Sequence, residues 1–221
     1  KTTENAYRDV QIAFANEVAQ ICEAVGGDVW KVRALVNKSP YRSMHFPGAG
    51  VGGHCIPKDP WLLAFGVKEK EIELNLIPAA RKVNDSMPHH MVDLLENVLS
   101  EYGKLIKGSK ILVMGYAYLE NSDDIRNSPS IPLVKEIQRK GGIAIIHDPY
   151  IQDYAADLYS AASGCDAAVL MVAHNEYKSL DLTKLKGILR SPAFVDGRNV
   201  IKRKELEQNG YKYRVLGSVS E

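Results

Sequence analysis

Apolar residues near the start of the chain recur every three or four positions, the spacing of an amphipathic helix. They are Val10, Phe14, Val18, Ile21 and Val25. The pattern predicts one helix over residues 1–25, which Gly26 and Gly27 end. Asp28 is well placed to cap a second, short helix that continues through Val36.

A longer helical stripe begins near Leu74 and continues towards Tyr102. Its members are Leu76, Ala80, Val83, Met87, Met91, Leu94 and Val98. Pro88 interrupts this stripe, so we expect the helix to kink there or to restart after Ser86. A stripe of this length on a small domain usually needs a partner, and we expect a second copy of the chain to cover it.

The pattern changes around residues 103–109, after which short apolar strands alternate with helices. Strands are expected at 110–114, 143–147, 167–172, 193–195 and 211–216, and helices at 128–140, 182–189 and 202–209. Such alternation predicts a parallel sheet that is covered on both faces. The fold class is therefore α/β, with a helical domain at 1–106 followed by a domain built on a parallel sheet at 107–221.

Composition excludes several classes of function. The 221 residues carry a formal net charge of +1, which gives no electrostatic case for nucleic acid or an anionic membrane. No apolar run approaches the roughly 18 residues of a membrane span, and the charged start Lys1–Glu4 is unlike a signal peptide. The chain begins without a methionine inside a predicted helix, so we expect a preceding segment to be missing. The partner is expected to be a small molecule or another protein.

The three cysteines, Cys22, Cys55 and Cys165, are widely spaced and odd in number. They argue against a disulfide framework and against a Cys-x-x-Cys metal site, so no metal is expected. A reducing, cytoplasmic compartment fits them best.

The run from Gly48 to Pro60 carries the most promising chemistry, because its glycines deliver Cys55 beside Lys58 and Asp59. Glycines let a backbone approach a ligand closely, and a nearby ammonium favours the reactive thiolate form of a cysteine. Their bare amides also suit phosphate oxygens. The alternative is a simple turn next to an inert cysteine.

Three glycines of this loop, Gly48, Gly50 and Gly53, formally satisfy the dinucleotide fingerprint G-x-G-x-x-G. A true fingerprint follows a strand and opens a helix. This run follows Pro47 instead, and the strand predicted at 110–114 leads into Gly115 without a fingerprint. We therefore expect no standard NAD site within these residues.

Several motifs occur in a fixed order along the chain. They are Lys1-x-x-x-Asn5, Ala15-Asn16-Glu17, the loop Gly50–Asp59, Asn84-Asp85, Asp123-Asp-Ile-Arg126-x-Ser-Pro129, His147-Asp-Pro149 and Asp196-Gly-Arg198. In this combination the chain resembles the central and C-terminal domains of the nucleotide-sugar 6-dehydrogenases, which include UDP-glucose, UDP-N-acetylmannosamine and GDP-mannose dehydrogenases. The resemblance implies a helical domain that forms a homodimer and a Rossmann-like domain that binds the UDP-sugar. It also implies that the family's NAD-binding domain lies outside these residues.

The resemblance further implies a reaction and its catalytic residues. Members oxidise the C6 alcohol of a nucleotide-linked sugar to a carboxylate, passing hydride twice to NAD. Cys55 matches the thiol that adds to the C6 aldehyde and carries a thioester. Lys1 and Asn5, which share a helix face, match the donors to the C6 oxygen, although such a pair could also be a solvated helix start. Asp59 matches the aspartate that organises the base and water.

Binding residues follow from the same resemblance. The segment that would wrap the sugar and diphosphate comprises Phe46, Pro47, Gly48, Ala49, Gly50, Val51 and Gly52. Tyr118 and Arg198 match substrate-binding positions, and Arg42 matches less clearly an arginine that reaches across the dimer. Lys58 and Arg126 match residues near the nicotinamide and the NAD pyrophosphate.

One position departs from the family pattern. Leu119 stands where many members carry a lysine that contacts the substrate, so another side chain must do that work or this branch holds its substrate differently.

The residues around the cysteine bear on the choice of sugar. His54 and the pair Pro60-Trp61 resemble the branch that oxidises UDP-N-acetylhexosamines, which favours UDP-N-acetylmannosamine, although His54 could instead be a structural anchor of the loop. Two other functions remain open. The chain could be a non-catalytic module that binds a UDP-sugar and dimerises, or a cysteine hydrolase, which would need a histidine base near Cys55.

Overall fold

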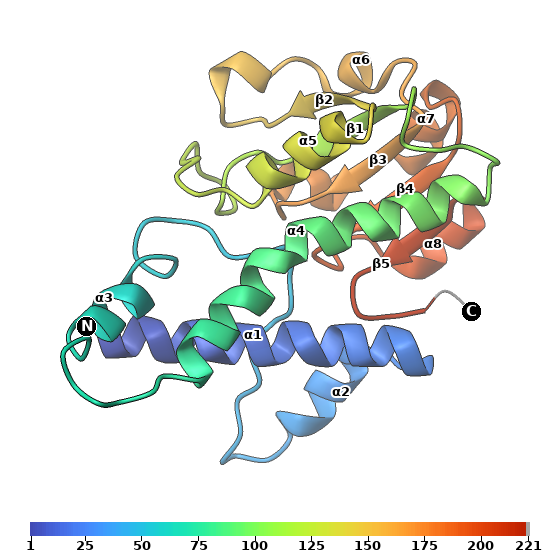
Figure 1. Cartoon of the computed structure of the whole chain (residues 1–221). Coiled ribbons are helices and arrows are strands. Elements are labelled where there is room, and N and C mark those ends of the chain that lie inside the picture. The colour runs from blue at the N-terminus through green and yellow to red at the C-terminus, as the bar shows by residue number, and fades with distance from the viewer. Residues whose placement is uncertain (220–221) are drawn as a thin grey trace.

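The computed structural model describes residues 1–219, and its N-terminal part is helical as predicted (Figure 1). Helix α1 spans Thr2–Val25 and ends at Gly26, whose positive φ of 75° lets its N–H donate to a carbonyl of the last turn. Helix α2 spans Val29–Val36. The Asp28 side chain accepts hydrogen bonds from two backbone N–H groups of its first turn, which confirms the predicted cap.

Two further helices complete this part. Helix α3, Asp59–Phe65, starts directly after the glycine loop and was not predicted. Helix α4, Leu76–Ser100, runs through Pro88 without a break, so the predicted restart after Ser86 is wrong. Figure 1 shows α4 changing direction partway along its length, as expected when an interior proline removes one backbone hydrogen bond.

The apolar stripe of α4 is buried within the chain itself. Met87, Met91, Val98 and Leu99 are fully buried, in one core cluster with side chains of α1 and of the sheet. The expectation that a second copy covers the stripe is therefore wrong for these residues, whereas for Leu76, which is exposed at the start of α4, it stays a prediction. Burial of methionine on both sides of Pro88 also explains why the helix continues through it.

A parallel five-stranded sheet forms the second part of the chain. Its strands are β1 (Lys110–Met114), β2 (Ile143–His147), β3 (Ala167–Leu170), β4 (Ala193–Asp196) and β5 (Lys212–Val215). The spatial order is β2-β1-β3-β4-β5. All five predicted strands are confirmed, with ends that differ by no more than two residues.

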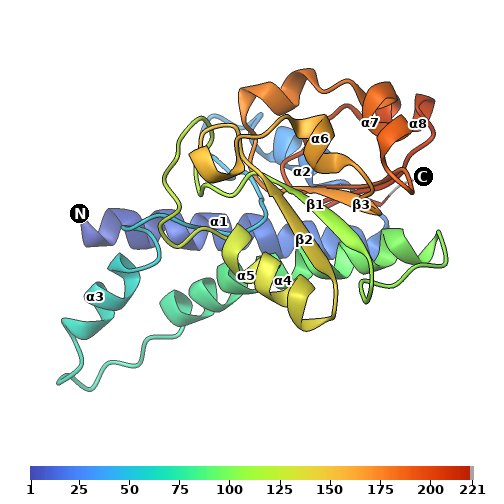
Figure 2. The ribbon, with the colours of Figure 1, turned by 90° about the horizontal axis from the view of Figure 1, so that it is seen from above.

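Helices cover both faces of the sheet, as the sequence predicts. They are α5 (Ser130–Arg139), α6 (Leu158–Ala162), α7 (Leu182–Ile188) and α8 (Arg203–Gln208), with 3-10 turns η1 (Gln152–Tyr154) and η2 (Asn175–Ser179). Figure 2 shows the sheet between α4 and α5 on one side and α6, α7 and α8 on the other. Alternate residues of β1 accordingly enter two clusters: Ile111 packs with α4 and α5, whereas Leu112 packs with α6 and α7.

The helical part and the sheet are joined by more than α4. The Trp30 indole N–H donates to the Leu216 carbonyl at 2.9 Å, and Asp28 pairs with Arg203 of α8 at 2.8 Å. One core cluster spans both parts. The predicted domain boundary at 106/107 stays a prediction, because α4 packs on α1 and on the sheet alike. No helix within residues 1–219 is long and apolar enough to cross a membrane.

Candidate functional site

A cavity of about 850 Å³ opens at the carboxyl edge of the sheet, against the glycine loop. Strand β1 lies between β2 and β3, so the chain passes to one side of β1 to form β2 and then crosses to its other side to form β3. Ligands in such sheets bind at the point where the strand order reverses. The lining joins segments that are far apart in sequence. It comprises Arg8, Ile12, Trp30, His45–Gly48, Gly50–Gly52, Ile56, Tyr118–Glu120, Ala173, Lys178 and Arg198–Val200.

Two glycines of the loop are required by close neighbours. A Cβ on Gly48 would lie 2.4 Å from Nη1 of Arg198, and one on Gly52 would lie 2.5 Å from Cβ of Tyr118. Neither position can carry a side chain while those neighbours stay where they are. The loop thus lets the Arg198 guanidinium and the Tyr118 side chain of the sheet domain approach its backbone.

Buried polar side chains fix the start of the loop from the helical part. The Gly48 N–H donates to Asn16 Oδ1 at 2.8 Å, Asn16 Nδ2 donates to Asn84 Oδ1 at 2.9 Å, and Asn84 Nδ2 donates to Asp9 Oδ1 at 2.7 Å. Arg81 Nη1 closes the series on the same Asp9 oxygen at 2.6 Å. Burial raises the pKa of Asp9, while Arg81 opposes that shift.

This series has a direction, because a carboxylate can only accept hydrogen bonds. Asp9 turns the amide nitrogen of Asn84 towards itself, and each following amide must then present its oxygen to the next donor. The Gly48 N–H is therefore held inward. The expectation that glycine amides of this loop face a phosphate is wrong for Gly48.

Cys55 is an exposed free thiol at the end of the glycine loop. Its carbonyl accepts hydrogen bonds from the backbone N–H groups of Lys58 and Asp59, at 3.1 and 2.8 Å, which fold the chain into α3. The Asn5 amide Nδ2 donates to Asp59 Oδ2 at 2.5 Å, so the structure brings these two predicted catalytic residues together. Lys58 Nζ lies 3.0 Å from Nε2 of His54.

Other predicted residues lie farther from this group. Lys1 is exposed, and its ammonium pairs with Glu4 at 3.0 Å and not with Asn5 or Asp59. Ala49 is fully buried and does not line the cavity. Arg42 lines a separate cavity of about 640 Å³, beside α1.

Arg126 lies on an exposed loop and forms a two-pronged pair with Asp124, with its Nη2 2.6 Å from Oδ2. This pair holds the pKa of Asp124 below its usual range. The Arg126 carbonyl accepts the Gly53 N–H at 2.8 Å, and Asn127 Nδ2 donates to the Gly53 carbonyl at 2.9 Å. The loop that carries Arg126 is thereby attached to the glycine loop next to Cys55.

Arg198 reaches the cavity from the turn after β4. Asp196 fixes this turn by accepting backbone N–H bonds from Arg198, Val200 and Ile201. The guanidinium Nε donates to the Met171 carbonyl at 2.8 Å, which leaves the Nη atoms directed at Gly48. Burial lowers the pKa of Arg198, and the carboxylates of Glu120 and Asp196 oppose that shift.

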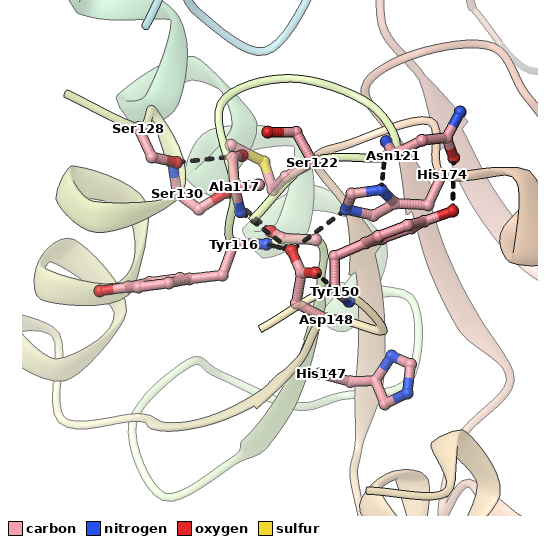
Figure 3. A network of polar contacts seen from close by, with 12 residues as sticks. Tyr116, Ala117, Asn121, Ser122, Ser128, Ser130, His147, Asp148, Tyr150 and His174 are labelled. Carbon is pink, nitrogen blue, oxygen red and sulfur yellow. Dashed lines mark hydrogen bonds and ion pairs between the residues drawn. The ribbon is translucent and has the colours of Figure 1, made fainter. Parts of the chain in front are cut away.

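The segment after β1, which bears Tyr118, is held by the buried carboxylate of Asp148 (Figure 3). Asp148 Oδ2 accepts the N–H groups of Tyr116 and Ala117 at 2.7 and 2.9 Å, and Nε2 of His174 lies 3.1 Å from the same oxygen. Burial alone would raise the pKa of Asp148, but these hydrogen bonds and that from Tyr150 N lower it to about 2.

The far end of this segment is anchored at Asn121, as Figure 3 also shows. The Asn121 N–H donates to Nδ1 of His174 at 2.9 Å, so the ring proton of His174 sits on Nε2, facing Asp148. The Asn121 side chain accepts from the Tyr150 hydroxyl and from the Asn175 N–H. Both ends of residues 116–121 are thus fixed, which positions Tyr118, Leu119 and Glu120 at the cavity.

Sequence reasoning missed several lining residues. Arg8 lies three residues after Asn5 on the same helix, a spacing that could have been read from the sequence. Lys178 and Glu120 come together only through the order of the strands, for which the sequence offers no local signal. Within the described residues, no group of three or more His, Cys, Asp or Glu side chains could hold a metal ion.

Comparison with known protein families gives two matches. The central-domain model of the UDP-glucose/GDP-mannose dehydrogenase family matches residues 1–86. The model of that family's UDP binding domain matches residues 112–203. Together they cover most of the chain, in the order expected from the motifs.

Curated relatives and solved structures agree with these matches. UDP-N-acetyl-D-mannosamine dehydrogenase of Methanocaldococcus jannaschii is 37% identical over 98% of this chain and 50% of its own length. The structure of the UDP-N-acetyl-D-mannosamine dehydrogenase of Pyrococcus horikoshii superposes with a TM-score of 0.90 at 36% identity, over 98% of this chain and 50% of that one. The NDP-N-acetyl-D-galactosaminuronic acid dehydrogenase of Methanosarcina mazei superposes with a TM-score of 0.93 at 38% identity, over 99% and 50%. The chain spans about half the length of the curated relatives it matches.

Proposed function

The chain belongs to the UDP-glucose/GDP-mannose dehydrogenase family, and we propose that it supplies the substrate site and catalytic cysteine of an NAD-dependent UDP-sugar 6-dehydrogenase. The observation that supports this most is the cavity at the reversal point of the sheet, where the loop bearing Cys55 meets Arg198. The proposed reaction is the four-electron oxidation of the sugar C6 alcohol to a carboxylate.

The lining suits a nucleotide-linked sugar. The Arg198 Nη atoms face the cavity beside Gly48, and a guanidinium can hold phosphate or sugar oxygens with two parallel bonds. Phe46 is half-exposed, and the Arg33 guanidinium lies 3.4 Å from the centre of its ring. A cation on one face leaves the other face of Phe46 as an apolar platform for a base or sugar.

Cys55, Asn5 and Asp59 would carry out the chemistry. The Cys55 thiolate adds to the C6 aldehyde, the adduct becomes a thioester once hydride has left, and water cleaves the thioester to the acid. Asn5 has two amide hydrogens, and Asp59 takes only one, so the second can donate to the C6 oxygen. Lys1, exposed and paired only with Glu4, can join them by a change of rotamer.

NAD, the cofactor of the family, accepts the hydrides when it is bound. The described residues do not form its cradle, because Gly48, Gly50 and Gly53 lie in a loop that does not follow a strand. Lys58 and Arg126 are exposed on the Cys55 side and would contribute only accessory charges to the cofactor.

Self-association is proposed through α1. Tyr7, Phe14 and Ile21 are spaced seven residues apart and are each more than half exposed, and they form an apolar stripe on one side of the helix. A second copy of the chain would cover this stripe, which adjoins the cavity lined by Arg42. In such a homodimer Arg42 could reach the partner's substrate. The three free thiols fit a reducing cytoplasm, which we propose as the compartment.

The sugar is proposed to be a UDP-N-acetylhexosamine, with UDP-N-acetylmannosamine first. Curated relatives named for that substrate are 33–37% identical to the chain over nearly all of it. The dehydrogenases named for N-acetylgalactosaminuronic acid are similarly close, which makes UDP-N-acetylgalactosamine the second candidate.

Calorimetric titration of the chain with UDP-N-acetylmannosamine, UDP-N-acetylgalactosamine, UDP-glucose and GDP-mannose tests the substrate. We expect the first to bind most tightly. Absence of binding by all four would refute the proposed function.

The thiol mechanism is tested in the gene product that carries this chain. Cys55→Ser should still bind UDP-sugar but form no uronate with NAD, whereas the control Cys165→Ala, a buried thiol under the opposite face of the sheet, should still form it. Uronate formation by Cys55→Ser would rule out the covalent step. Binding without turnover in the unmutated protein would instead favour the non-catalytic UDP-sugar module.

A further inference from the structure

The cavity lining carries four charged side chains, Arg8, Glu120, Lys178 and Arg198, and the family resemblance gives no role to Lys178 or Glu120. Arg198 and Lys178 are cations, and Glu120 is a carboxylate on the same rim. A UDP-sugar brings a diphosphate with two negative charges, so the carboxylate is out of place unless it moves or acts on the ligand. Leu119, the neighbour of Glu120, supplies no positive charge to offset this carboxylate.

Lys178 is held at the rim by a fixed frame. Its ammonium donates to Oδ1 of Asn175 at 2.9 Å, and the Asn175 N–H donates to Oδ1 of Asn121 at 3.0 Å. Asn121 is itself anchored to the buried His174. The ammonium is thus tied to the same network that positions the segment bearing Tyr118.

The bond between Lys178 and Glu120 is long and weak. Lys178 Nζ lies 3.5 Å from Oε2 of Glu120, and the two side chains are 48% and 52% exposed. An exposed ion pair of this kind contributes at most about 1 kcal/mol. An ammonium has three N–H groups, so Lys178 can keep its bond to Asn175 while it exchanges the carboxylate for another anion.

We propose that Lys178 binds the diphosphate of the UDP-sugar. In this proposal Glu120 pairs with the Lys178 ammonium only until the diphosphate displaces the carboxylate. The assignment rests on the proposed function and names a phosphate-binding residue within that same site. Lys178 supplies at the rim the positive charge that Leu119 does not, and Arg198 supplies a second one deeper in the cavity.

The charge on Arg198 gives a second reason to place Glu120 in the site. Glu120 raises the pKa of Arg198 against the effect of burial, so its field reaches this guanidinium as well as Lys178. A carboxylate between two cations is the position that a phosphate would take. Other exposed pairs, such as Lys202 with Glu205, lie outside the cavity lining.

The test compares uridine with UDP as probes of the chain in calorimetric titrations. Lys178→Met should weaken UDP about tenfold, the low end for a charge-assisted hydrogen bond, and leave uridine unchanged. Glu120→Gln should strengthen UDP binding severalfold by removing a like charge. Lys202→Met serves as the control, because it removes the same charge elsewhere on the surface and should change neither affinity.

A rescue variant separates phosphate binding from damage to the loop. Adding Leu119→Lys to Lys178→Met should restore most of the affinity for UDP, because the ammonium returns to the same rim. Restoration supports the proposal. An unchanged UDP affinity in Lys178→Met, both alone and combined with Leu119→Lys, overturns it. An equal loss of uridine and UDP in Lys178→Met would also overturn it, since the residue would then contact the nucleoside.

Two further outcomes are decisive. Weaker UDP binding by Glu120→Gln would mean that the carboxylate accepts a hydrogen bond from the ligand, which contradicts the displacement. A wild-type chain that binds neither uridine nor UDP would refute the proposed function itself, a result distinct from normal UDP binding that is insensitive to Lys178.

Discussion

Replacement of Asp148 by asparagine should destabilise the protein and loosen the substrate cavity together. The carboxylate is fully buried and accepts hydrogen bonds from Tyr116, Ala117, Tyr150 and His174. An asparagine has the same shape but only one oxygen. If that oxygen keeps the hydrogen bonds from Tyr116 and Ala117, the NH₂ group of the asparagine faces the Tyr150 N–H and cannot accept its hydrogen bond.

The magnitude follows from the pKa of Asp148. A pKa of about 2 in place of the usual 3.8 corresponds to about 2.4 kcal/mol of preference for the ionised form, at 1.36 kcal/mol per pH unit. The Tyr150 bond is one of the causes of that shift, so its loss is already included in this figure. We therefore expect Asp148→Asn to lower the free energy of unfolding at pH 7 by about 2.4 kcal/mol.

The pH dependence has a definite sign. The folded-state pKa of Asp148 is depressed, so the stability it contributes is fully present above the unfolded-state value near 3.8 and is lost as pH falls towards 2. Urea unfolding at pH 7, 5, 4 and 3 should show a gap between wild type and Asp148→Asn that is constant to about pH 5 and then narrows.

Two controls make the result interpretable. Asp153→Asn removes an exposed carboxylate from the same connection and should leave the stability within about 0.5 kcal/mol of wild type. UDP affinity should fall severalfold in Asp148→Asn, because the segment that bears Tyr118 loses its fixed support. Equal stability of Asp148→Asn and wild type at pH 7, or a gap that does not narrow on acidification, would refute the reasoning.

Three other substitutions test separate parts of the site. Gly48→Ala should push Arg198 aside and weaken UDP binding about tenfold. The melting temperature should stay within about 2 °C of wild type, because the displaced atom ends a flexible side chain. Unchanged UDP affinity would mean that Arg198 does not contact the ligand. Asn16→Ala should cost about 2–3 kcal/mol in urea unfolding and also weaken UDP binding, since it leaves the buried Gly48 N–H without its partner. Phe14→Glu, at a position that is 61% exposed, should give a monomer by light scattering while UDP still binds, whereas an unchanged mass would remove α1 from the interface.

The elements that the sequence predicts well are those with a local cause. Helix α1 has a regular apolar stripe and a glycine with positive φ after its last turn, and Asp28 caps α2 directly. The strands are short apolar runs between turn residues. Helix α3 was missed because its seven residues, nearly all apolar apart from Asp59, show no periodicity and follow a glycine loop.

The surroundings of α4 could not be predicted, since its stripe does not say what covers it. A second chain and the sheet of the same chain are equally apolar partners, and only the tertiary fold chooses between them. The apolar stripe on α1 shows the opposite outcome, because it stays exposed in the structure. Phe14 fits the predicted pattern of a buried residue but is exposed in the structure, so periodicity identified an apolar face without locating the core.

The residues of the site also fall into two groups, those that have a signal in the sequence and those that only the tertiary fold brings together. The glycine loop was found from its closely spaced glycines and cysteine, and Arg198 from the resemblance of Asp196-Gly-Arg198 to a family motif. The structure brings the loop and Arg198 together. The pairing of Glu120 with Lys178 joins residues 58 positions apart, from the turns after β1 and β3. Those turns are neighbours only because β1 and β3 pair in the sheet, which no local pattern reveals.

The glycine loop is hydrogen-bonded to both the helical part and the sheet domain, and these two attachments position it at the cavity. Asn16 fixes the Gly48 N–H from the helical part, while the Arg126 carbonyl fixes the Gly53 N–H from the sheet domain. Residues between these two points, and Cys55 just beyond them, can be only as well placed as the two parts are placed relative to each other. The core that α4 shares with α1 and the sheet sets that placement. Any substitution that loosens this shared core should therefore weaken the substrate site as well as the fold, even when it lies far from the cavity.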